Sequence, residues 1–236
     1  LMQGLDYLES IQSFNEEIKK TIVKLYSILA KLYSLLKNFQ EAERSVRKSL
    51  EHAEDIKDLK IIANAYRELG VVKREKGTYL ESIECFQMAR KIAANSRDLR
   101  IILEIERDIG VALRMKGDFE NALIVFQKAF DMSSRIGYDD LTGLFMNNIG
   151  MLYQKKGELE IACLSFKKAF EIKNKLKEPK SLVLTINDYV FLLLELGNYD
   201  EASLLVDKSI ELSEQIFDYE YFIRSLCLKS YCELKK

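Results

Sequence analysis

The chain has 236 residues, 48% of them hydrophobic and 31% charged, and its formal net charge is −1. This balance argues against nucleic acid as a direct partner, because phosphate binding needs a cationic surface. No apolar run reaches the roughly 18 residues that a membrane-spanning helix needs, and no signal peptide is recognisable. We therefore expect a cytoplasmic protein that does not insert into membranes.

Five related segments follow one another at intervals of forty residues. They are KNFQEAERSVRKSLEH from Lys37, GTYLESIECFQMARKI from Gly77, GDFENALIVFQKAFDM from Gly117, GELEIACLSFKKAFEI from Gly157 and GNYDEASLLVDKSIEL from Gly197. A partner segment with helical periodicity precedes each turn. Self-similarity at this period indicates stacked helix pairs.

The repeat period sets the expected elements in chain order. We expect an N-terminal capping helix over residues 1–14, helix pairs over about 15–56, 59–96, 99–136, 140–176 and 180–216, and the first helix of an incomplete sixth pair over 219–236. The single proline, Pro179, lies where a helix should begin, which suits its fixed geometry. No linker is long enough to separate domains, so we expect one repeat solenoid over 1–236.

Small residues recur inside the first helices, at Gly70, Gly110 and Gly150. Glycine in a helix interior costs about 1 kcal/mol relative to alanine, so its recurrence predicts close approach of a neighbouring helix. The second helices alternate small and large residues, as interlocking helices require. The large residues are Phe86, Phe126, Phe166 and Val206, and the small ones are Ser82, Ala122, Ala162, Ala202, Ala89, Ala129, Ala169 and Ser209.

These residues resemble the tetratricopeptide repeat (TPR). In the second repeat the matching residues are Leu69, Gly70, Gly77, Tyr79, Ser82, Phe86 and Ala89, whereas the last repeat departs with Val190 in place of the helix glycine. The forty-residue unit without a closing proline is similar to the extended repeats of peptide-sensing bacterial regulators, polarity adaptors and kinesin-light-chain-like scaffolds. The resemblance implies an all-α fold, a right-handed α–α superhelix of about five helix pairs plus terminal helices, whose first helices line a concave groove.

No arrangement of residues indicates catalysis. His52 is the single histidine, and the four cysteines form no CxxC pair. The glycines follow the repeat period and make no phosphate-binding loop. The charged stretch KNKLKEPK over 173–180 is expected to be a solvated helix end and loop. We therefore expect a non-enzyme with no cofactor and no metal site.

The expected groove-lining positions, which are 2, 5, 9 and 12 of each first helix, change in character along the chain. The N-terminal half is rich in cations and contains Lys31, Asn64, Arg67, Arg74, Arg107 and Arg114. The other lining positions in this half are Lys24, Ser27, Ser34, Val71, Glu104 and Val111. The C-terminal half is apolar with amides and contains Leu144, Asn147, Met151, Gln154, Leu184, Asn187, Phe191 and Leu194.

This pattern predicts that the groove binds a peptide or helical segment of a partner protein, with acidic residues near the arginines and apolar residues near Met151 and Phe191. We expect Asn147 to contact the ligand and Asn148 to bridge adjacent helices. In an alternative interpretation, the arginines pair with Glu68, Glu104 and Asp108, and the apolar set packs against the next repeat or another copy.

Three functions remain open at this stage. The first is a non-catalytic interaction module. The second is a sensor or regulatory domain of a larger transcription regulator or signalling protein. The third is a self-assembling solenoid, a homo-oligomer formed through its terminal helices.

Overall fold

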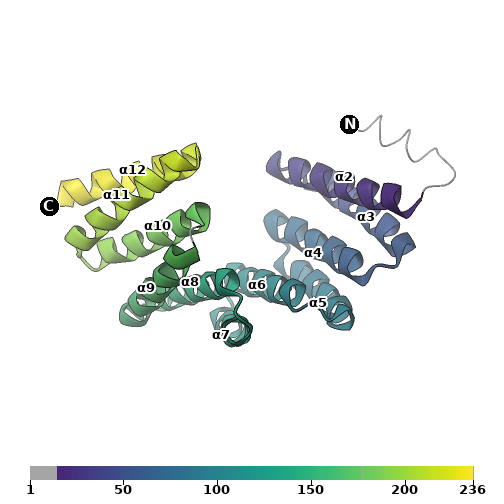
Figure 1. Ribbon diagram of the computed structural model, residues 1–236, viewed down its shortest axis with the longest axis horizontal. Helices are drawn as coiled ribbons and strands as arrows, with labels where there is room; N and C mark the ends of the chain where they lie inside the picture. The colour runs from purple at the N-terminus through teal and green to yellow at the C-terminus, as the bar shows by residue number, and fades with distance from the viewer. Residues whose placement is uncertain (1–14, 177, 236) are drawn as a thin grey trace. The chain divides into compact units, whose positions relative to one another are not determined.

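The computed structural model describes residues 15–176 and 178–235, and the capping helix expected over residues 1–14 lies outside them (Figure 1). Within the described part the backbone forms eleven α-helices and no strand, so the all-α prediction is confirmed. The chain divides into two compact units, Leu1–Asp118 and Phe119–Lys236. That the repeats form one continuous solenoid stays a prediction.

Unit 1 contains five described helices, each of which packs against the next. They are α2 (Glu16–Leu35), α3 (Phe39–Ile56), α4 (Leu59–Lys76), α5 (Tyr79–Ser96) and α6 (Leu99–Lys116). Side-chain caps fix where several of them begin. For example, Asp58 Oδ1 accepts from the backbone N–H groups of Lys60 and Ile61 at the start of α4.

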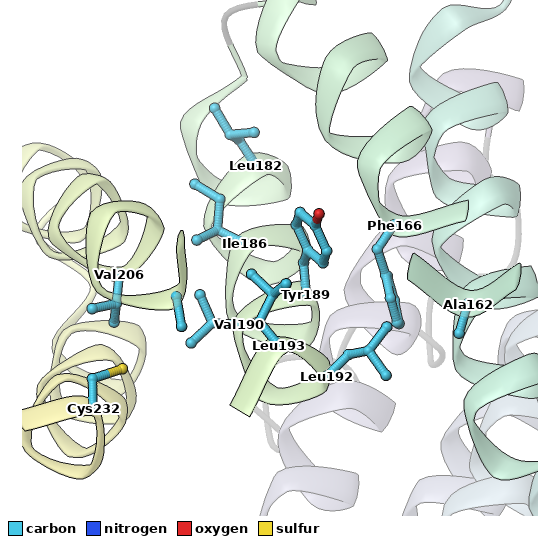
Figure 2. Close-up of a cluster of buried hydrophobic side chains, with 11 residues drawn as sticks. Ala162, Phe166, Leu182, Ile186, Tyr189, Val190, Leu192, Leu193, Val206 and Cys232 are labelled. Carbon is cyan, nitrogen blue, oxygen red and sulfur yellow. The ribbon is translucent and has the colours of Figure 1, made fainter. Parts of the chain in front are cut away.

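Unit 2 contains six helices, again packed in sequence. They are α7 (Phe119–Ile136), α8 (Asp139–Lys155), α9 (Leu159–Leu176), α10 (Pro179–Glu195), α11 (Tyr199–Gln215) and α12 (Tyr219–Lys235). Pro179 occupies the first turn of α10, as predicted. Unit 2 has a hydrophobic core cluster from α9, α10, α11 and α12 that includes Phe166, Tyr189 and Cys232 (Figure 2).

The turns inside the helix pairs are built on a left-handed residue. Gly77 ends α4 at φ 90°, and its N–H donates to the carbonyl oxygen of Arg74. Lys37 takes the same position in the weakest repeat, at φ 57°. The turn geometry is therefore kept where glycine is absent.

Two of the three helix-interior glycines, Gly70 and Gly150, make room for a phenylalanine ring, which confirms the predicted close approach at these positions. A Cβ atom at Gly70 would lie 2.5 Å from Phe86, and one at Gly150 would lie 3.1 Å from Phe166. The last pair has Val190 and Val206 instead, and both are fully buried (Figure 2). One large and one very small residue are thus replaced by two of intermediate size.

Candidate functional site

The first helices of each unit lie side by side, α2 with α4 and α6 in unit 1, and α8 with α10 and α12 in unit 2. Their facing side chains are joined by polar contacts between residues about forty positions apart. In unit 2, for example, Gln154 Nε2 donates to Glu195 Oε2 at 2.6 Å. These contacts determine which of the predicted groove residues remain open to a ligand.

The arginines of unit 1 converge on one buried carboxylate. Arg67 Nε donates to Asp108 Oδ2 at 2.6 Å, and its Nη1 donates to Glu104 at 2.7 Å. Arg74 and Arg107 approach the other Asp108 oxygen at 3.6 and 2.8 Å. Asp108 is only 2% exposed. The alternative interpretation, in which these arginines form ion pairs within the fold, is thereby confirmed for all three.

The remaining predicted residues of unit 1 differ in exposure. Asn64 and Arg114 are half-buried on α4 and α6. Lys31 is exposed on α2, and its Nζ lies 3.6 Å from Glu68 Oε1. Among the six residues expected in this half of the groove, Lys31 therefore presents its charge most openly.

A cleft of about 610 Å³ opens between α2, α3 and α4, within the size range typical of ligand sites. It is lined by Ser27, Ala30, Lys31, Ser34, Leu35, Lys37, Phe39, Val46, Arg67, Glu68, Val71, Val72 and Glu75. The lining is mostly apolar, with charges of both signs. Five of the predicted groove-lining residues contribute to it, namely Ser27, Lys31, Ser34, Arg67 and Val71.

Two buried polar atoms in this cleft have no hydrogen-bond partner in the described part of the chain. They are Ser34 Oγ and Glu68 Oε2. Buried polar atoms in folded proteins are nearly always paired, so each such atom calls for an explanation. A bound group that donates hydrogen bonds would satisfy both.

The amides of unit 2 correct the sequence-based expectation. Asn147 is 3% exposed, and its Nδ2 donates to Asp188 of α10 at 3.0 Å. Asn148 donates to the Leu144 carbonyl oxygen of its own helix at 2.9 Å. Asn147 therefore bridges the helices, the part expected of Asn148.

Asn187 is also misassigned by the sequence pattern, because it is fully buried. Its Oδ1 accepts hydrogen bonds from Ser209 at 2.8 Å and from Ser225 at 3.2 Å. The amide thus links α10 to α11 and α12. A direct ligand contact by Asn147 or Asn187 does not fit this burial.

The predicted apolar residues of unit 2 are partly accessible. Leu144, Met151, Leu184 and Leu194 are half-buried, and Met151 and Leu194 pack against the core cluster. Phe191 is 51% exposed. Phe191 is therefore the predicted apolar side chain most available to a partner.

Lys173 is a buried cation that the sequence pattern placed in solvent. It is 1% exposed on α9, and its Nζ donates to Thr185 Oγ1 at 2.7 Å and to the Ser181 carbonyl oxygen at 3.4 Å. Gly143 leaves space for it, since a Cβ there would lie 2.9 Å from Lys173 Cγ. Burial lowers the pKa of Lys173 to about 8, although Asp188 and Glu178 raise it.

This pKa predicts a pH-dependent stability. The unfolded chain binds the Lys173 proton more tightly than the folded chain, so stability from this group rises with pH between about 8 and the ordinary value. We compare the free energy of unfolding of the wild type with that of a Lys173→Met variant. The difference, wild type minus variant, should increase by about 1 kcal/mol between pH 8 and 9. Urea denaturation of both proteins at the two pH values measures this. A constant difference would contradict the low folded-state pKa.

Three further observations concern metal binding, thiol chemistry and membrane insertion. In that part of the chain, no group of three or more His, Cys, Asp or Glu side chains is arranged to hold a metal ion. Burial raises the pKa of the Cys85 thiol, which disfavours the reactive thiolate. No helix among the described residues has the length and apolar character to cross a membrane.

Family models for the tetratricopeptide repeat match residues 61–135 with one model and residues 23–55 and 145–176 with another, together more than half of the chain. The chain belongs to the tetratricopeptide-repeat family. Its extended repeats are the form that the glycine spacing predicts, and its all-α repeat fold is confirmed. A comparison with curated proteins gave no match.

Three solved structures illustrate the shared TPR fold. The Rap conjugation gene regulator of the plasmid pLS20, in complex with the Phr* peptide, has a TM-score of 0.78 at 20% identity, over 96% of this chain and 64% of that one. Aspartyl phosphate phosphatase F from Bacillus subtilis has a TM-score of 0.80 at 18% identity, and the match covers 92% of this chain and 57% of that one. A signal transduction ATPase with a tetratricopeptide repeat sensor, from Pyrococcus horikoshii, has a TM-score of 0.75 at 19% identity, and the match covers 99% of this chain and 35% of that one.

The chain spans between 35% and 64% of the length of these three proteins. At such identities the likeness concerns the fold alone. The activities and ligands of the longer proteins are therefore no part of what the comparison establishes for this TPR chain.

Proposed function

We propose that this TPR chain is a non-catalytic interaction module, which binds a peptide or a helical segment of a partner protein in the cleft of unit 1. The observation that carries the proposal is the pair of unpartnered atoms, Ser34 Oγ and Glu68 Oε2, in a cleft lined by apolar residues and by charges of both signs. Both oxygens can accept a hydrogen bond. Backbone N–H groups of a peptide supply donors whatever its side chains are.

The cleft also indicates which side chains the ligand carries. Apolar groups fit against Ala30, Val46 and Val71. An acidic group fits near Lys31 and Lys37, both of which are exposed at the cleft. This differs from the sequence-based expectation, which placed acidic ligand groups at the arginines, because those arginines are bound to Asp108.

One comparison also supports a peptide ligand. The Rap conjugation gene regulator of the plasmid pLS20, which is similar to this chain in fold, was solved in complex with the Phr* peptide. Peptide binding by this chain is inferred from its own cleft.

A selection from a random peptide display library, followed by anisotropy titration of the selected peptides, tests the site. Val71→Arg places a long cation in the cleft and should weaken binding at least about tenfold, or roughly 1.4 kcal/mol. Val111→Arg is the matched control, since Val111 is half-buried forty residues later on α6 and does not line the cleft. Equal weakening by both, or by neither, would rule out the cleft as the binding site.

A second candidate is a sensor domain within a larger regulator or signalling protein. The signal transduction ATPase favours it, because that protein has a tetratricopeptide repeat sensor and resembles this chain in fold over 99% of the chain. Sequencing of the reading frame beyond both ends of the chain tests this. An adjoining output domain supports the sensor role, and stop and start signals at the ends contradict it.

A further inference from the structure

The second helices of unit 2, α7, α9 and α11, carry three rows of residues, of which eight are exposed and one, Lys208, is half-buried. The apolar row is Ile124, Leu164 and Leu204, which are 48%, 69% and 74% exposed. Four residues before each lies an acid, and four residues after each lies a lysine. The acidic row is Glu120, Glu160 and Asp200, and the lysine row is Lys128, Lys168 and Lys208.

Residues four apart lie on one face of a helix. The acidic and lysine rows therefore flank the apolar row at equal distances, about 6 Å along the helix axis on either side. We call this set of nine residues the three-row face.

Side-chain contacts hold the helices of this face in register. Lys168 Nζ lies 4.8 Å from the centre of the Phe130 ring on α7, and Lys208 Nζ lies 5.0 Å from the centre of the Phe170 ring on α9. Lys208 also donates to Asn174 of α9 at 2.8 Å. These contacts hold Lys168 and Lys208, two of the three lysines of the row, against the neighbouring second helix.

The corresponding positions of unit 1 do not repeat the pattern. Arg44 and Glu84 occupy the position that Ile124, Leu164 and Leu204 take in unit 2. The exposed apolar row is therefore absent from α3 and α5. General repeat packing does not explain it, because α3 and α5 pack into the same kind of helix pair without it.

We propose that the three-row face binds the same face of a second copy of this chain. A half-turn about an axis that lies in the plane of the interface and runs along the apolar row places the acidic row of one copy over the lysine row of the other, and the apolar row over itself. Leu164 then meets Leu164 of the other copy, and Lys168 meets Glu160. Such a self-complementary patch is what a twofold dimer requires, and the charge pattern selects the antiparallel arrangement.

This interface differs from the terminal helices, through which the sequence suggested self-association. It is also independent of the peptide cleft, whose residues all belong to unit 1. Dimerisation and peptide binding can therefore fail separately in experiment.

Sedimentation equilibrium over a dilution series from low micromolar to near-millimolar concentration tests the proposal. The wild type should form a concentration-dependent dimer, and Leu164→Glu should raise its dissociation constant at least about tenfold. Leu80→Glu is the matched control on α5, because Leu80 is 63% exposed outside the face. Its dimer should match that of the wild type. Circular dichroism melting checks that each variant is folded.

Charge reversal provides the sharper arm of the test. One variant carries Lys128→Glu, Lys168→Glu and Lys208→Glu, and the other carries Glu120→Lys, Glu160→Lys and Asp200→Lys. Each alone should be monomeric, and an equimolar mixture should form a heterodimer. A wild type that stays monomeric overturns the proposal, and it does so even if the three-row face binds vesicles of anionic lipid instead. So does a dimer that survives Leu164→Glu, or a mixture of folded variants that stays monomeric.

Discussion

Replacing Asp108 by asparagine is expected to destabilise unit 1 by about 3 kcal/mol. The side chain keeps its shape, but Arg67, Arg74 and Arg107 are then left facing one another around a neutral amide. Because Asp108 is 2% exposed, water cannot reach this position to solvate the arginine charges that the carboxylate neutralises. Urea denaturation followed by circular dichroism measures the change in the free energy of unfolding.

Glu104→Gln is the control for this prediction. Glu104 pairs with Arg67 at 2.7 Å, but the two side chains are 26% and 20% exposed. Ion pairs that remain partly solvated typically contribute 1 kcal/mol or less. If Asp108→Asn costs no more than Glu104→Gln, then Asp108 does not organise the arginine cluster, and the structural interpretation of these arginines is wrong.

Gly70→Val is expected to destabilise unit 1 by at least about 2 kcal/mol, because the new Cβ would lie 2.5 Å from the Phe86 ring. Phe86→Val alone leaves a cavity in the core and should cost a similar amount. The double variant places two valines together, as Val190 and Val206 already are in the last pair. It should therefore be more stable than the sum of the two single changes by about 2 kcal/mol.

Thermal and urea denaturation of the four proteins in this cycle supply the coupling energy. A matched pair of changes at Gly150 and Phe166 should couple less strongly, since the Cβ distance there is 3.1 Å. Additive effects at both sites would contradict the idea that glycine and phenylalanine are fitted to each other in these repeats.

The fold could be predicted from the sequence because its signals are local and repeated. The turn glycines and the glycine–phenylalanine pairs recur every forty residues, so each copy supports the assignment of the others. Even the exception, Val190, was visible as a departure from the motif. Its partner Val206 gives the physical reason, which is conserved volume across the helix pair.

The candidate site was harder to predict, because it depends on which side of each first helix faces a neighbour. Successive helical residues differ by about 100° in direction. A small rotation of the helix is therefore enough to bury Asn147 and Asn187 and to direct Asn147 towards Asp188. The sequence gives positions along a helix more reliably than the angle at which the helix packs.

Contacts between distant residues explain the other differences. Lys173 lies in a charged stretch and is buried because Gly143, thirty residues earlier, leaves space for its side chain. Asp108 binds three arginines from two helices, which the sequence pattern offered only as one of two interpretations. No local pattern around Lys173 indicates its burial, and none around Asp108 decides between the two interpretations of the arginines.

Photo-crosslinking of a selected peptide most directly tests the claim that the unit 1 cleft binds peptides. A diazirine-bearing version of the peptide is irradiated with the folded chain, and the labelled residues are identified by tandem mass spectrometry. We expect labels at cleft residues such as Leu35, Phe39 and Val71, with loss of labelling in Val71→Arg. Labels confined to unit 2, or unchanged by Val71→Arg, would contradict the account.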